Sequence, residues 1–176
     1  EKQGPKVAII RRIMFYAQVT PEFADKIYNL NLTDNKHFIK VKGQQFPSIV
    51  AKSGIRQGCP LSPYLFVIFM TVLFHDVENE VGEKVIKRSM DFVDFSNILY
   101  ADDTFLIGKR SRELNKILWA IEKHLSRYGM RLNKKKCIYI NMNVKNRIRF
   151  KDGTAMPNED EADYLGAKIT KKNLNK

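Results

Sequence analysis

Two adjacent aspartates, Asp102 and Asp103, stand between two short apolar runs at residues 97–100 and 104–107. Successive residues on a straight strand point to opposite faces, so only a turn brings both carboxylates near one point. The pattern therefore predicts a strand, a tight turn and a second strand. Two close carboxylates repel each other unless a cation lies between them, and Mg²⁺ prefers such hard oxygen ligands. A solvent-exposed turn without a metal is the alternative.

Positive charge is concentrated in one segment of the chain. The 176 residues include 31 Lys and Arg against 19 Asp and Glu, which gives a net charge of +12. Residues 109–151 contain 14 of the basic residues and only 2 acidic ones. Clustered positive charge on a folded domain favours nucleic acid as the partner, because each cation placed at a phosphate releases condensed counterions. A solvated face that keeps the protein soluble is the alternative.

A loop with two glycines, residues 54–61, precedes a long apolar helix that is predicted to begin at Ser62-Pro63. Gly58 lets the backbone approach a ligand closely, and the partial positive charge at a helix N-terminus suits phosphate. Alone, this loop is weak evidence for a site. Together with the paired aspartates and the basic segment, it predicts phosphoryl transfer on nucleic acid by a two-metal scheme.

The composition argues against two other classes of protein. The cysteines, Cys59 and Cys137, are far apart and lack metal-ligand spacing, which argues against a disulfide scaffold and a zinc site. The longest apolar run, residues 61–74, is interrupted by polar residues and by Pro63, and it is shorter than the roughly 20 residues that span a bilayer. No membrane association is predicted.

The patterning predicts one α+β unit with antiparallel strands. Apolar periodicity and capping residues predict helices after Pro5, after Thr20-Pro21, from Ser62-Pro63 into an acidic surface stretch at 76–83, and from a Ser111 cap to Gly129. Expected strands are 37–42 and 46–51 as a hairpin around Gly43-Gln44, 137–142, 147–150 before a turn at Asp152-Gly153, and 164–169. The histidines His37, His75 and His124 are scattered and are expected to be structural.

Four segments, in order, resemble motifs of the reverse transcriptases, most closely those of non-LTR (LINE-type) retrotransposons and next those of group II introns. Residues 54–66 resemble motif B, Tyr100-Ala101-Asp102-Asp103 motif C, residues 129–136 motif D, and Tyr164-Leu165-Gly166 the primer-grip region. The resemblance implies a partial right-hand polymerase fold: a palm with a ferredoxin-like antiparallel sheet and helices packed on one face. On this resemblance, residues 1–176 are expected to form a single partial domain.

The resemblance also implies roles for individual residues. Asp102 would be a principal ligand of two Mg²⁺ ions, or of Mn²⁺ in their place, and Asp103 a less direct ligand. Lys136, or its neighbours Lys134 and Lys135, would lie near the leaving pyrophosphate, although a solvated turn is an equal alternative for these lysines. The residues expected at the nucleotide, the template or the primer end are Arg56, Gln57, Gly58, Tyr100 and Ala101.

The implied partners are an RNA template, a DNA primer, dNTPs and the remainder of a larger retroelement polyprotein. The family's motif A aspartate is expected upstream of Glu1, together with the fingers, and the thumb is also expected outside the chain. This chain alone is therefore expected to be nearly inactive as a polymerase. One alternative is a catalytically inactive or domesticated remnant that binds nucleic acid, and another is an RNA-directed RNA polymerase. The location in the cell is not predicted, beyond the nucleus for a eukaryotic retroelement.

Overall fold

A computed structural model describes residues 18–23, 25–26, 35–37, 39–47, 49–51, 58–82, 85, 99–100, 103–141 and 147–171. The chain divides into two compact units, Glu1–Val72 and Leu73–Lys176. The described residues form helices and two-stranded antiparallel ladders, as expected for an α+β chain. The first predicted helix, after Pro5, lies outside the described residues.

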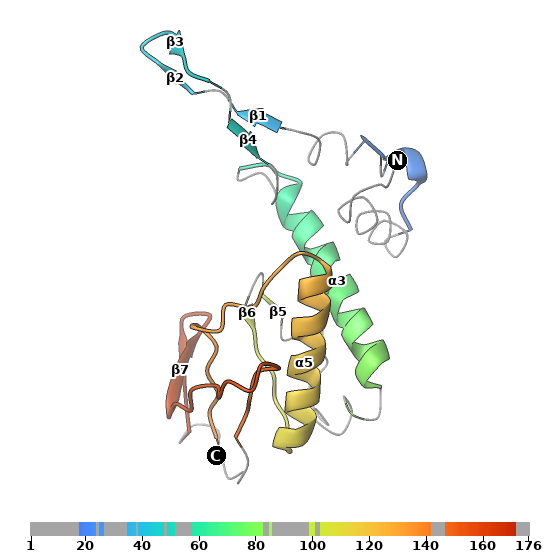
Figure 1. Cartoon of the computed structure of the whole chain (residues 1–176), viewed down its shortest axis with the longest axis vertical. Helices are drawn as coiled ribbons and strands as arrows, with labels where there is room; N and C mark the ends of the chain where they lie inside the picture. The colour runs from blue at the N-terminus through green and yellow to red at the C-terminus, as the bar shows by residue number, and fades with distance from the viewer. Residues whose placement is uncertain are drawn as a thin grey trace. The chain divides into compact units, whose positions relative to one another are not determined.

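The first unit contains a twisted hairpin and the start of a helix (Figure 1). Strands β1 (Asn35–His37) and β4 (Ile49–Ala51) pair with each other, as do β2 (Lys40–Val41) and β3 (Gln44–Gln45). The predicted turn is displaced by one residue: it is Lys42-Gly43, with φ of 50° and 83°. Both central φ values are positive, as a type I′ hairpin turn requires, and glycine adopts the second without a steric penalty.

The predicted helix starts are partly confirmed. The Phe23 N–H donates to the Thr20 hydroxyl at 3.4 Å, which is the expected cap before Pro21. Helix α3 (Ser62–Val81) begins at the predicted Ser62-Pro63. Its acidic end is not all surface, however, because Asp76 is only 4% exposed.

The second unit is built on helix α5 (Ser111–Arg127), which lies beside the C-terminal part of α3 (Figure 1). Ser111 was expected to cap α5, but it is the first helical residue and is buried, and the N-cap Arg110 makes no side-chain cap bond. The predicted end at Gly129 is confirmed. The Met130 N–H donates to Leu125 O at 2.8 Å and the Gly129 N–H to Ser126 O at 3.1 Å, which together form a Schellman motif.

Apolar side chains from both helices and the following hairpin form the core. Ile117 and Ile121 of α5 and Val77 of α3 are at most 5% exposed. On its other side α5 packs, through Leu118, against Ile148 and Phe150, which are 6% and 2% exposed. The hairpin around Asp152-Gly153 is confirmed, since the Phe150 N–H donates to Thr154 O at 2.9 Å.

Three strand predictions need correction. Residues 147–150 form only an isolated bridge, in which Arg149 pairs with Ala155. Residues 137–141 form only an isolated bridge, in which Tyr139 pairs with Asn158. Residues 164–169 are not one strand: β7 (Glu161–Tyr164) and β8 (Ala167–Thr170) form a hairpin around Leu165-Gly166. Each ladder in the described residues has two strands, so the continuous ferredoxin-like sheet stays a prediction.

Candidate functional site

The residues on either side of Ala101-Asp102 belong to two paired strands. Strands β5 (Leu99–Tyr100) and β6 (Asp103–Thr104) pair antiparallel, with Tyr100 opposite Asp103. The two residues between these partners are Ala101 and Asp102, which lie outside the described residues. The predicted pairing of two strands around the aspartates is therefore confirmed, with β6 beginning at Asp103 itself, while the turn between them lies outside the described residues.

An aromatic contact joins this hairpin to the one that carries Tyr164-Leu165-Gly166. Phe105, two residues after Asp103, lies with its ring centroid 5.3 Å from that of Tyr164, at an interplanar angle of 35°. Contacts of this geometry stabilise by about 0.5–1.5 kcal/mol beyond the area they bury. Two segments about 60 residues apart in the sequence, both predicted to belong to one site, are thus adjacent.

The turn at Leu165-Gly166 exposes an apolar side chain. Leu165 has φ of 51° and Gly166 has φ of 77°, and the Leu165 side chain is 51% exposed. A left-handed backbone is costly for a leucine, and such strain clusters at functional sites. The left-handed backbone and the exposed apolar side chain make this turn a candidate contact surface.

The glycine loop before α3 is described only at its end. Gly58 has φ of 80°, which favours glycine, and the Ser62 N–H donates to Cys59 O at 3.1 Å. Arg56 and Gln57 lie outside the described residues. This loop belongs to the first compact unit, and the hairpins with Asp103 and Tyr164 belong to the second.

The three lysines after α5 have different environments. The Lys134 Nζ is 2.7 Å from Asp152 Oδ2 and 3.1 Å from Glu122 Oε1, and it lies 4.9 Å from the centroid of the Phe150 ring. Lys135 and Lys136 are exposed and form no ion pair in the described part of the chain. Lys134 is thus held by the fold, whereas Lys136 remains available to a ligand.

Glu122 fixes the same region from helix α5. Its Oε2 accepts the Lys151 N–H at 2.7 Å while its Oε1 contacts Lys134. The hydrogen bond from Lys134, assisted by the Thr154 N–H, lowers the pKa of Asp152 from its ordinary 3.8 to about 2. The same bond, followed by that from Glu122, raises the pKa of Lys134. This network holds the turn that carries Lys136.

Acid should loosen this turn. A carboxyl whose pKa is depressed on folding contributes stability above its unfolded pKa and loses it as the pH falls through the folded pKa. The contribution of Asp152 is therefore complete above about pH 4 and is lost toward about pH 2. We expect Asp152→Asn to reduce the difference in urea midpoint between about pH 6 and about pH 3, when unfolding is followed by Trp119 fluorescence. An equal pH dependence in the variant and the parent would contradict this assignment.

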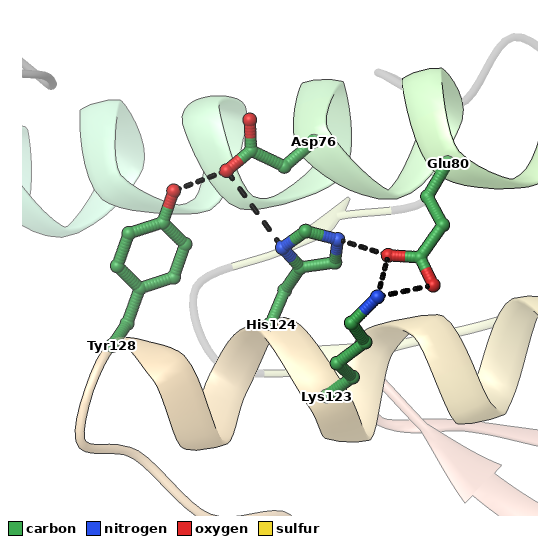
Figure 2. Close-up of polar contacts among 5 residues, drawn as sticks. All are labelled: Asp76, Glu80, Lys123, His124 and Tyr128. Carbon is green, nitrogen blue, oxygen red and sulfur yellow. Dashed lines mark hydrogen bonds and ion pairs between the residues drawn. The ribbon is translucent and has the colours of Figure 1, made fainter.

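A second polar cluster joins α3 to α5, and the sequence analysis missed it (Figure 2). The Tyr128 hydroxyl donates to Asp76 Oδ2, and the His124 Nε2 lies 2.8 Å from Glu80 Oε2. Lys123 donates to both Glu80 oxygens at 2.9 Å, which is the main reason that the pKa of Glu80 is lowered. His124 is only 5% exposed, and its contact with Glu80 was not foreseen, although it was expected to be structural. The repeated spacing of four, in Asp76/Glu80 and in His124/Tyr128, was the available signal.

The contact with Glu80 defines which atom of His124 donates. An ionised carboxylate only accepts hydrogen bonds, so Nε2 donates to Glu80. The Nδ1 atom is buried, has no hydrogen-bond partner among the described residues, and lies 3.8 Å from Asp76 Oδ2. The cluster joins the two helices by hydrogen bonds from donors at α5 to carboxylates on α3, and we interpret it as structural.

Neither a complete metal centre nor a membrane span is found in the described part of the chain. No three His, Cys, Asp or Glu side chains among the described residues are grouped to hold an ion, and Asp102 was not in that set. None of the described helices combines the length and the apolar character needed to cross a bilayer.

Comparisons with known proteins agree on one family. A family model described as reverse transcriptase (RNA-dependent DNA polymerase) matches residues 13–169, and so includes parts of both units. The chain is 32% identical over 98 residues to a retrovirus-related Pol polyprotein from type-2 retrotransposable element R2DM of Drosophila melanogaster. That match covers 56% of this chain and 9% of the polyprotein. No solved structure gives a significant match.

Proposed function

Because the chain belongs to the reverse transcriptase family, we propose that it forms part of a polymerase palm that extends a DNA 3′ hydroxyl on an RNA template. The expected similarity to non-LTR retrotransposon enzymes is confirmed by the match to the R2 polyprotein. The chain spans about a tenth of the length of that relative. We therefore assign the activity to a longer protein that contains this sequence, with both compact units in one partial domain.

The observation that carries the proposal is the pairing of Tyr100 with Asp103, which leaves Asp102 in a two-residue hairpin connection. A connection of this length keeps two successive carboxylates within one turn, and their oxygens fit the ligand preference of Mg²⁺. In this role Asp102 is a principal metal ligand and Asp103 a less direct one. When bound, Mg²⁺ or Mn²⁺ would stabilise negative charge on the attacking 3′ oxygen of the primer and on the departing pyrophosphate.

The other residues bind and orient the substrates. Tyr100 and Ala101 lie beside the primer end, and Tyr164, Leu165 and Gly166 support the primer. The contact between Phe105 and Tyr164 supports this arrangement, because it holds the two hairpins together.

The nucleotide is bound from two loops. Arg56 and Gln57 contact the nucleotide and the template, and Gly58 makes room for them. Lys136 supplies positive charge at the departing pyrophosphate. Lys134 is less suited to this role, because its charge is already paired with Asp152 and Glu122. This pairing supports the choice of Lys136 indirectly.

Primer extension tests the proposal. In the longest natural protein that contains these residues, dNTPs should be added to a DNA primer on an RNA template, and chelation with EDTA should remove the activity. Returning Mg²⁺ should restore it, because the carboxylates need the ion to bind triphosphate. Synthesis that survives full chelation would contradict the two-metal assignment. Binding without any synthesis would favour the alternative, an inactive remnant that binds nucleic acid. Incorporation of rNTPs in place of dNTPs would favour an RNA polymerase.

A further inference from the structure

The solvent face of α5 is basic and has a tryptophan at its centre. Six positions on this helix are exposed: Arg112, Lys116, Trp119, Lys123, Ser126 and Arg127. At 3.6 residues per turn these positions form one stripe, which spans about 22 Å of helix. The carboxylates of α5 lie off the stripe, since the Glu113 and Glu122 side chains are 12% and 11% exposed.

Most of the charge on this stripe is not neutralised by the protein. Glu80 pairs with Lys123. Arg112, Lys116 and Arg127 form no ion pair in the residues that the structure describes. A row of unpaired cations on one helix face creates a local positive potential, and its complement is a polyanion.

Trp119 is held in place although it is exposed. It is 41% exposed, and its Nε1–H donates to Arg149 O at 2.8 Å. The Arg149 N–H in turn donates to Asn115 Oδ1 at 3.0 Å, so that the Arg149 backbone is bonded to α5 through both its N–H and its C=O. The hydrogen bond fixes the indole, but it does not explain why so much of a large aromatic side chain faces solvent.

Arg149 extends the basic surface beyond the helix. Its side chain is exposed, and its guanidinium donates to Gly153 O at 2.9 Å. A fixed aromatic ring flanked by arginine and lysine is the arrangement that proteins use for unpaired bases and their phosphates, and stacking on a held ring costs little side-chain entropy.

We propose that this face of α5 binds single-stranded nucleic acid, with an unpaired base stacked on Trp119 and phosphates at Arg112, Lys116 and Arg127. The charge and the aromatic ring point to the same ligand. This site is separate from nucleotide addition, since none of its residues belongs to the proposed polymerase centre. Binding here therefore needs neither Asp102 nor Mg²⁺.

Trp119 is the one tryptophan in the sequence, and so it reports on its own site. We expect a labelled RNA or DNA strand of about 15 nucleotides to change its emission on binding, in EDTA and with the Asp102→Asn variant alike. Parallel titrations with RNA and with DNA identify the preferred strand. An emission that stays constant while the labelled strand is fully bound would overturn the proposal.

Charge reversal on the stripe provides the second measurement. The double variant Arg112→Glu/Lys116→Glu should weaken binding at least about tenfold and lower the slope of log affinity against log salt by about 1.4, which corresponds to two phosphate contacts. The matched control is Lys40→Glu/Lys171→Glu, which changes the net charge equally at exposed positions outside α5. Equal losses in the two double variants would mean that only the overall charge attracts the strand, and would overturn the proposal.

Two variants of Trp119 separate stacking from structure. Trp119→Phe keeps an aromatic face but loses the bond to Arg149, and it should retain affinity within about threefold. Trp119→Ala should lose about 5- to 100-fold in anisotropy titrations of the labelled strand. An equal loss of affinity in both variants would mean that Trp119 acts only through its hydrogen bond to the Arg149 backbone. It would exclude the stacking contact with a base.

Discussion

We expect the replacement of Asp102 with alanine to lower the rate of nucleotide addition by at least about 1,000-fold and to leave the fold intact. The rate loss follows from the chemistry of the step, because removing one group that stabilises transition-state charge typically costs this much. The fold survives because the change removes one of two repelling carboxylates. Asp103→Ala should lose less, since the resemblance places it as the less direct ligand.

The measurement is single-turnover primer extension by the longer protein, with circular dichroism as the check on folding. Asp25→Ala is the matched control, because Asp25 is exposed on the short helical segment after Pro21 and has no role in the proposed metal site. Its rate should equal that of the parent protein. Substantial synthesis by Asp102→Ala would remove this residue from the metal site. The single-strand binding proposed for α5 would remain, because it does not involve the metal.

Local patterns in the sequence predicted α3, α5 and the pairing of the strands beside the aspartates well. Helix α5 follows from its apolar period and from Gly129, whose φ of 73° completes the C-terminal motif. The β5–β6 hairpin follows from polar residues between two apolar runs. In both cases the information lies within a few residues of the element, so no tertiary contact is needed to predict it.

The errors arose where structure depends on distant residues or on an unusual backbone. Leu165 in a left-handed conformation is a turn residue that no propensity favours, so the apolar pattern was interpreted as one strand from 164 to 169. Asp76 was interpreted as surface because its neighbours are acidic, whereas its burial depends on Tyr128, 52 residues away.

In the candidate site, too, local features could be predicted from the sequence and features that depend on distant residues could not. The sequence placed three lysines after α5 but did not distinguish among them, because their difference depends on Glu122 and Asp152, contributed by other elements. The stripe on α5 could have been read from its periodicity, since its basic residues recur every three or four positions around Trp119. The fixed orientation of that ring could not, because it depends on a backbone carbonyl 30 residues away.

The cluster between α3 and α5 leads to the second large effect, on stability. Asp76→Ala should lower the free energy of unfolding of the second unit by about 2–4 kcal/mol. The Tyr128 hydroxyl then loses this acceptor in a partly buried position. Urea unfolding followed by Trp119 emission measures this loss, because Trp119 lies on α5 itself.

Glu80 is the matched comparison, because it contacts the same histidine from the same helix. Its side chain is 35% exposed against 3% for Asp76, so water replaces the lost contacts when it is truncated. Glu80→Ala should therefore cost less than about 1 kcal/mol, although it removes contacts to both Lys123 and His124. Asp76→Asn, which keeps an acceptor for Tyr128, should fall between the two alanine variants. Equal costs for Asp76→Ala and Glu80→Ala would show that burial does not set the strength of this cluster, and that the contacts of His124 with Glu80 matter as much as the buried bond between Asp76 and Tyr128.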